Sequence, residues 1–354
     1  MNMKNIYKII SDYQNGKELA LATIIETSGS TPQKQGFSAL FNVEGLISGT
    51  IGGGVLEGRV QKIAGSLISE KRSGIYHFDF DNNISFKTEA ICGGEATILI
   101  DAFPSRYKLV FEKVNKSLSN RNPGVLVTII TGDEDNKKEI NRYWVAKDEG
   151  NLLPIEYLEI VNGEAEKILA SGKPEGFKKI DILNSGKEKS AIILFEPLFP
   201  RPQLVIAGAG HIGRAIAHIG SFLDFEVVVI DDRAEFANKS NIPDADIIFV
   251  KDIGIAIDEL RKTADTYFVI VTRGHDDDAK ALRPCINSGA AYVGMIGSRT
   301  KIAKMHSSFI QNGWATEEQW STVHAPIGLE IGSKTVEEIA ISIAAELVLV
   351  RSRK

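Results

Sequence analysis

A glycine-rich segment in the C-terminal half has the residue types and spacing of a phosphate-binding turn. It is Gly208-Ala209-Gly210-His211-Ile212-Gly213 and lies between the apolar run QLVIA and a helix-compatible stretch. In this G-x-G-x-x-G motif, Gly208 permits a tight turn, Gly210 lets the backbone approach a pyrophosphate, and Gly213 lets the helix pack on the strand. The motif predicts N–H groups and a positive helix end that face an anion. A glycine turn kept only for packing is the alternative.

Two further residues lie where such a site would use them. Asp231 ends the apolar run EVVVID, about 20 residues after the glycines, where its carboxylate could accept hydrogen bonds from a ribose. His275 follows the run YFVIVT. In the usual strand order this run neighbours the first strand, so we expect His211 and His275 to share the site.

Other polar residues near this edge allow a functional and a structural interpretation. Asp276, Asp277 and Asp278 could bind a metal or act as bases, but they also suit the first turn of the next helix. His324 belongs to HAPIGLEIG, a loop before the last helix. It either faces the same rim or is exposed to solvent, and the sequence leaves both choices open.

The N-terminal half contains a second candidate anion site. Gly52, Gly53 and Gly54 open a segment with helical spacing of apolar residues. Three unhindered amides at a helix N-terminus favour an oxyanion or a phosphate, although a packing turn is the alternative. Glu57, in the first turn, suits the helix dipole but disfavours that anion.

The two cysteines differ in their expected roles. Cys92 precedes a glycine pair, where an exposed thiolate could bind a soft metal or carry sulfur, and where a buried inert thiol is the alternative. Cys285, inside an expected helix beside Pro284, is predicted to lie in the core. Only two cysteines, far apart in sequence, argue against a disulfide framework and for a reducing compartment.

The apolar pattern predicts the scaffold that positions these residues. Beyond residue 200, the runs QLVIAG, EVVVID, ADIIFV, YFVIVT and AYVGMIG alternate with helix-compatible stretches. Strands apolar on both faces that alternate with helices form a parallel sheet covered on both sides. We therefore predict an α/β fold with a Rossmann-like, doubly wound parallel sheet over residues 199–354. Its last helix is expected to follow Thr335, which can form a capping box with Glu338.

Residues 1–198 are predicted to form an α+β domain. ELALATII is expected to be a strand, residues 38–54 to form a hairpin, and a helix to begin at the triple glycine. Four further runs are expected to be strands: YHFDF, EATILIDAF, GVLVTII and AIILFEPLF. The polar stretch between the last two runs is left unassigned. Pro197, Pro200 and Pro202 predict an extended connector that cannot continue a central strand, which places the domain boundary there.

Composition and charge exclude several classes of protein. A chain of 354 residues with 43% hydrophobic and 25% charged residues is typical of a globular protein of about two domains. The net charge is −5 and neither half is basic, so we expect no nucleic-acid partner and no membrane partner. We see no secretory signal and no run of roughly 20 apolar residues, and we expect a cytoplasmic protein.

Longer segments resemble the XdhC/CoxI family, the accessory proteins of xanthine dehydrogenase and related molybdenum hydroxylases. The resemblance covers TSGSTPQKQG, GTIGGGVLEG, CGGEATILID, EPLFPRPQLVIAGAGHIG, the DDR at Asp231 to Arg233, TRGHDDDAKAL, YVGMIGSRTK and HAPIGLEIGSKTVEEIAISIAAE, which together span most of the chain. Some relatives carry a cysteine after the first glycines, where this chain has Val55. Cys92 is then the only thiol available in the N-terminal half.

The resemblance implies a chaperone for the molybdenum cofactor. Such a protein binds molybdopterin, supports its sulfuration by a cysteine desulfurase and delivers it to the hydroxylase apoprotein, without a reaction of its own. A homodimer is expected from the family alone. The phosphate end of the ligand would lie on residues 208–213 or 52–54, and Cys92, His275 and Arg299 would face its dithiolene and metal end.

Two other functions remain open at this point. One is an NAD(P)-dependent oxidoreductase acting on a small carbonyl or hydroxy substrate, with Asp231 selecting NAD and His275 donating a proton. The other is a module that senses a nucleotide and regulates a partner protein.

Overall fold

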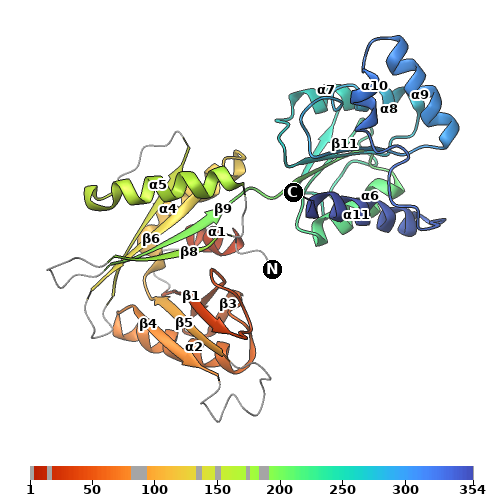
Figure 1. Cartoon of the computed structure of the whole chain (residues 1–354). Helices are drawn as coiled ribbons and strands as arrows, with labels where there is room; N and C mark the ends of the chain where they lie inside the picture. Colours follow the sequence, from red (N-terminus) through yellow and green to blue (C-terminus); the bar gives the residue numbers. More distant parts are fainter. Residues whose placement is uncertain are drawn as a thin grey trace. The chain divides into compact units, whose positions relative to one another are not determined.

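The computed structural model describes residues 4–13, 18–80, 94–132, 138–147, 153–172, 176–182 and 191–353. The chain divides into two compact units, Met1–Pro200 and Arg201–Lys354. Figure 1 shows their secondary structure. Cys92, one of the expected site residues, lies outside the described residues.

The C-terminal unit is built on a five-stranded sheet with the order β12-β11-β10-β13-β14. Its strands are β10 (Gln203–Ala207), β11 (Glu226–Asp231), β12 (Ile247–Val250), β13 (Thr266–Ile270) and β14 (Tyr292–Met295). All neighbouring strands run parallel. The first strand lies at the centre, and the chain adds strands on one side of it and then on the other. This is the doubly wound arrangement predicted from the apolar runs, and the α/β fold class is confirmed.

Helices cover both faces of this sheet (Figure 1). They are α6 (His211–Phe222), α7 (Ile253–Glu259), α8 (His275–Leu282), α9 (Arg299–Gln311), α10 (Glu317–Ser321) and α11 (Val336–Ser352). Successive residues of a strand face opposite sides, so β10 contributes to two cores. Val205 and Ala207 pack with α7, α8 and α9, whereas Leu204 and Ile206 pack with α6 and α11. The expected capping box at the start of α11 is present.

The N-terminal unit contains two antiparallel sheets, with the orders β3-β2-β1-β5-β4 and β7-β6-β9-β8. The first consists of β1 (Ala20–Gly29), β2 (Ser38–Asn42), β3 (Gly45–Gly49), β4 (Gly74–Asp79) and β5 (Gly94–Asp101). The second consists of β6 (Gly124–Thr131), β7 (Glu139–Ala146), β8 (Lys178–Ile182) and β9 (Ala191–Leu198). The predicted hairpin is β2–β3. Antiparallel sheets with helices confirm the predicted α+β class.

Helices pack against both of these sheets. They are α1 (Lys4–Asp12), α2 (Gly54–Glu70), the short 3₁₀ helix η1 (Pro104–Tyr107), α4 (Lys108–Ser119) and α5 (Ile155–Ser171). Helix α2, which begins at the triple glycine as expected, packs on β1, β2 and β5. Helix α5 packs on β6 and β9, while α1 and α4 share a core with residues of both sheets.

One expectation about the proline-rich connector is wrong. Pro197 is part of strand β9, where it pairs with Val125 of β6. On the other side of β9, the pairing with β8 reaches only as far as Phe195. A proline is tolerated where a strand has a neighbour on one side only, because its missing N–H then breaks no hydrogen bond of the sheet. The extended segment therefore begins after Leu198.

In the part of the chain that the structure describes, no helix combines the length and the apolar character that crossing a membrane requires.

Candidate functional site

The turn between β10 and α6 is held by its first and last glycines. Gly208 has φ +116°, and a Cβ there would lie 2.5 Å from the carbonyl oxygen of Val271, at the end of the neighbouring strand β13. A Cβ on Gly213 would lie 1.9 Å from the carbonyl oxygen of Gly208. Both glycines are therefore required by backbone packing, which is the structural part of the motif.

Gly210 differs, because the fold gives no steric reason for a glycine there. Its φ is −71°, which any residue adopts, and a Cβ at this position would meet no atom within 4 Å. It is the N-cap of α6 and provides no side chain to cap the helix, and the first turn of α6 contains no acidic residue. The first N–H groups of a helix have no acceptor within the helix. The N–H groups of Gly208 and Ala209 already donate to the Ile230 carbonyl and to Asp231, so the turn offers a phosphate the amides at the start of α6 and the open space beside Gly210.

The helix after the neighbouring strand β13 also has a glycine N-cap, but its first turn carries three aspartates. Within residues 201–353, all of which are described, the helices α7, α9, α10 and α11 each have an N-cap side chain that accepts a backbone hydrogen bond. The N-caps of α6 and α8 are instead Gly210 and Gly274, which have no side chain to make such a bond. Since β10 and β13 are adjacent and parallel, both helices start at the carboxyl edge of the sheet, on opposite faces of it. Exposed His211 and His275 are their first residues.

Asp231 lies at the end of β11, as expected, but its carboxylate is already engaged. It accepts hydrogen bonds from the N–H of Ala209 (2.8 Å) and the N–H of Arg233 (3.0 Å). It also accepts two from the Arg233 guanidinium, both at 2.8 Å. Burial acts to raise the pKa of Asp231, but these hydrogen bonds outweigh it and lower the pKa. This carboxylate therefore anchors the glycine turn through the Ala209 N–H, and few of its acceptor positions remain for the hydroxyl groups of a ribose.

The three aspartates of α8 have separate roles. Asp278 is fully buried, accepts a hydrogen bond from the Thr272 hydroxyl (2.5 Å) and pairs with Lys301 of α9. Burial raises the pKa of the Asp278 carboxyl, and the bonds from Lys301 and Thr272 oppose that increase. Asp277 pairs with Arg273, whereas Asp276 is exposed. Asp278 is therefore a structural link between two helices.

His324 lies beside β14 rather than in a free loop. Its backbone N–H donates to the carbonyl oxygen of Val293 at 2.9 Å. Its ring Nδ1 lies 2.8 Å from Glu346 Oε1. Its ring is 4.5 Å from that of Tyr292, whose hydroxyl also donates to Glu346. The side chain is 36% exposed, so it is neither fully open to solvent nor fully enclosed. Burial would raise the pKa of the Glu346 carboxyl, but the bonds from His324 and Tyr292 contribute to lowering it.

Arg299, the other expected rim residue, is the first residue of α9 after β14. Its side chain is 91% exposed and lies 3.8 Å from the equally exposed Glu330. It follows β14, so it lies at the same edge of the sheet as the glycine turn. The turn follows β10, however, and β13 lies between β10 and β14 in the sheet.

The N-terminal glycines form a turn that is less suited to an anion. Gly52, Gly53 and Gly54 all have positive φ, and a Cβ on Gly52 would lie 2.6 Å from the Pro32 side chain. The Glu57 carboxylate accepts hydrogen bonds at the start of this turn, from Thr50 Oγ1 (2.9 Å) and the N–H of Ile51 (3.3 Å). The Gly52 N–H in turn donates to Thr50 Oγ1 (3.1 Å), so one of the three glycine amides is already engaged and a carboxylate lies next to this turn.

Metal ligands and the remaining cysteine complete the candidate groups. Among the described residues, no cluster of three or more His, Cys, Asp or Glu side chains could hold a metal ion. Cys285 is completely buried, as predicted, although α8 ends at Leu282 and the cysteine lies in the turns that follow. Burial raises the pKa of its thiol well above the ordinary value, which disfavours the thiolate.

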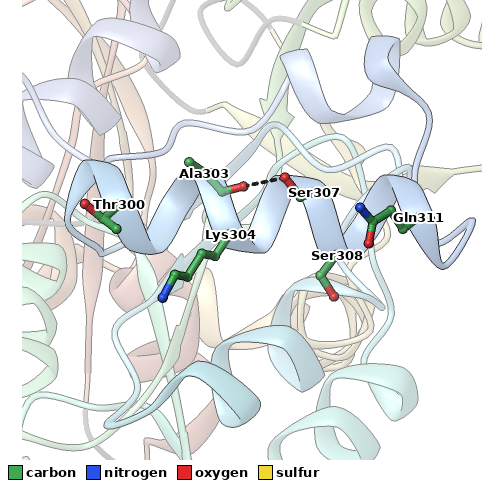
Figure 2. Close-up of a pocket in the computed structure, with 6 residues that line it drawn as sticks. All are labelled: Thr300, Ala303, Lys304, Ser307, Ser308 and Gln311. Atoms are coloured by element: carbon green, nitrogen blue, oxygen red, sulfur yellow. Dashed lines mark hydrogen bonds between the residues drawn. The ribbon is translucent and has the colours of Figure 1, made fainter.

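A surface hollow on the C-terminal unit lies along α9 (Figure 2). Its lining residues all belong to that helix: Thr300, Ala303, Lys304, Ser307, Ser308 and Gln311. The hydrogen bond drawn in the figure joins Ser307 Oγ to the Ala303 carbonyl within the helix, at 3.0 Å. A single helix face surrounds a ligand on one side only, so we do not assign a site to it.

Several cations at the carboxyl edge of the sheet were not predicted from the sequence as parts of the site. Arg233 engages Asp231, Lys301 neutralises Asp278, and Arg273 pairs with Asp232 and Asp277. Arg233 belongs to the DDR segment that resembles the family, but no role at the site was predicted for it from the sequence.

Two family models match the chain. The model described as the XdhC Rossmann domain matches residues 204–347, and that of the XdhC and CoxI family matches residues 13–79. Together they match more than half of the chain, and each falls in a different unit.

Known proteins resemble the chain over different lengths. A protein of Bacillus subtilis (strain 168) described as a probable xanthine dehydrogenase subunit is 23% identical over 344 residues, which cover 96% of this chain and 95% of that protein. The uncharacterized protein YqeB of Escherichia coli (strain K12) is 35% identical over 153 residues, which cover 43% of this chain but only 28% of that protein.

A solved structure shares the fold. The crystal structure of a xanthine dehydrogenase from Bacillus halodurans has a TM-score of 0.73 to this chain at 21% identity, covering 100% of this chain and 97% of that one. The two matched domain models, the near full-length relative and the shared fold agree, and the chain belongs to the XdhC and CoxI family.

Proposed function

We propose that the protein is a xanthine dehydrogenase accessory protein that binds the molybdenum cofactor, supports its sulfuration and inserts it into a xanthine dehydrogenase-type molybdenum hydroxylase. Its membership of the XdhC and CoxI family supports the association with xanthine dehydrogenase. Under this proposal the partners are the hydroxylase apoprotein and a cysteine desulfurase, and the active form is a homodimer.

The observation that carries the proposal is the open position of Gly210. A residue that packing does not require to be glycine lies at a helix N-terminus that has no side-chain cap and no acidic residue in its first turn. The absence of a Cβ there leaves room for an atom group to reach the amides, and a phosphate matches both their hydrogen-bonding capacity and the positive helix end. Molybdopterin carries such a phosphate. The bound cofactor would supply the molybdenum and dithiolene chemistry, and residues 208–213 would hold its phosphate end.

The engaged state of Asp231 argues against the NAD-dependent oxidoreductase. In that function this carboxylate would bind the ribose hydroxyl groups. Here it accepts hydrogen bonds from Ala209 and Arg233, and giving them up would uncover a largely buried charge. A ligand bound through its phosphate to residues 208–213 makes no such demand.

Gly210→Val is expected to abolish copurification of the cofactor without unfolding the protein. The valine side chain would occupy the space in front of the amides, whereas the fold offers it no clash at Cβ. The measurement is the fluorescence of oxidised pterin extracted from protein made in a host that synthesises the cofactor.

Gly163→Val is the matched control, since a Cβ at Gly163 in α5 also meets nothing within 4 Å. We expect the control to retain the wild-type pterin content. Equal pterin in wild-type protein and Gly210→Val would refute the assigned turn, and tight NADH binding with turnover of carbonyl compounds would replace the proposal with the oxidoreductase.

A further inference from the structure

Arg273 lies directly beside the glycine turn. It follows β13 in the loop before α8, two residues after Val271. A Cβ on Gly208 would come within 2.5 Å of the Val271 carbonyl oxygen and 3.1 Å of the Thr272 nitrogen, so the two backbones are in contact. The side chain of Arg273 is 54% exposed. It is therefore a cation within reach of the place where residues 208–213 present their amides.

The partners of Arg273 come from both sides of that turn. Its Nη2 lies 3.3 Å from Asp232 Oδ2, just after β11, and its Nε lies 3.3 Å from Asp277 Oδ2 in α8. In the sheet, β10 lies between β11 and β13. The Arg273–Asp232 ion pair thus bridges the two strands that flank β10, at the edge where the glycine turn begins.

These ion pairs are weak enough to be exchanged. Asp232 is 48% exposed, both distances are long for a charge-assisted hydrogen bond, and exposed pairs of this kind contribute little to stability. Arg233, in contrast, is fixed by two short bonds to buried Asp231. A phosphate offers an arginine shorter, bidentate hydrogen bonds. Of the two arginines, Arg273 is the one that can change partners at low cost.

We propose that Arg273 clamps the phosphate of the bound ligand and that Asp232 competes with this phosphate for the guanidinium. The inference rests on the proposed cofactor site at residues 208–213 and adds to it a residue and a means of tuning affinity. With the ligand absent, Arg273 pairs with Asp232 and Asp277. When the phosphate arrives, the guanidinium exchanges Asp232 for the phosphate oxygens.

The test compares two substitutions that break the same ion pair. Molybdopterin released from a molybdenum hydroxylase is titrated into the full-length protein, and its dissociation constant is measured for each variant. Arg273→Gln should weaken binding about tenfold or more, because charge-assisted hydrogen bonds to the phosphate are lost. Asp232→Asn should tighten binding by about two- to fivefold, because a competitor for Arg273 and a charge that repels the phosphate are removed.

Lys304→Gln, on the face of α9 shown in Figure 2, removes the same charge away from the turn and should leave affinity unchanged. If both Arg273→Gln and Asp232→Asn weaken binding, the ion pair only supports the fold and the inference is wrong. Wild-type affinity in both variants would also reject it, while leaving the cofactor site intact. Absence of binding by the wild-type protein would overturn both the site and the clamp.

Discussion

Gly213→Ala is expected to destabilise the C-terminal unit by at least about 3 kcal/mol, at or above the upper end of the usual overpacking penalty. The added Cβ would lie 1.9 Å from the Gly208 carbonyl oxygen and 3.0 Å from its carbon. Neither neighbour is the end of a flexible side chain, so relief requires α6 to move away from β10. That movement would disturb the packing of Ile216 and Ala217 against the sheet. Calorimetric unfolding, with limited proteolysis to identify the unit that opens, measures the effect.

The control is Gly210→Ala in the same turn. An alanine at Gly210 meets no atom within 4 Å, and replacing an N-cap glycine costs about 1 kcal/mol or less. The structure therefore predicts that the last glycine of the motif is needed for folding and that the middle one is needed for binding. Equal stability of the two alanine variants would contradict this division.

Glu196→Gln is expected to stabilise the N-terminal unit at pH 8 by up to about 3 kcal/mol. Glu196 of β9 is 8% exposed, and burial raises its pKa to about 7, against opposing effects of the Tyr7 hydrogen bond (2.5 Å) and of Arg142. The unfolded chain ionises this carboxyl near its ordinary value. As pH increases from that value to about 7, the folded state therefore loses stability, and above about 7 the full cost remains. Glutamine carries no charge at any pH and still accepts the Tyr7 hydrogen bond.

The stability difference should consequently decrease towards zero at pH 5, where the native carboxyl is protonated. Urea unfolding at a series of pH values measures it. Glu159→Gln on the exposed surface of α5 is the matched control and should show no such pH profile. A Glu196→Gln protein less stable than the wild type at pH 8 would show that the ionised carboxylate is favourable at this buried position.

The C-terminal fold could be predicted because its signals are local. Five apolar runs, each followed by a helix-compatible stretch, are sufficient for a doubly wound sheet, and the strand order then places residues 208–213 beside the end of β13. The N-terminal fold was harder. β7, β8 and α5 were not predicted from the polar stretch, because such elements acquire their order from packing against β6 and β9.

Which side chains of the site are already paired with other protein groups could not be predicted, because the pairing depends on contacts between residues far apart in the sequence. Asp231 has the position of a ribose acceptor in the sequence, but only the structure shows that Ala209 and Arg233 take up its oxygens. Asp278 could equally have been a metal ligand until Lys301, from another helix, was found beside it. Sequence identifies which groups can do chemistry, whereas the pairing of charges decides which of them remain available.

Hydrogen exchange with and without added molybdopterin tests most directly whether residues 208–213 bind the phosphate of the cofactor. If they do, exchange should slow in peptides that cover these amides and the start of α8, since both uncapped helices face the same edge. Unchanged exchange there, with protection confined to residues 52–54 or elsewhere in the N-terminal unit, would contradict the proposed site.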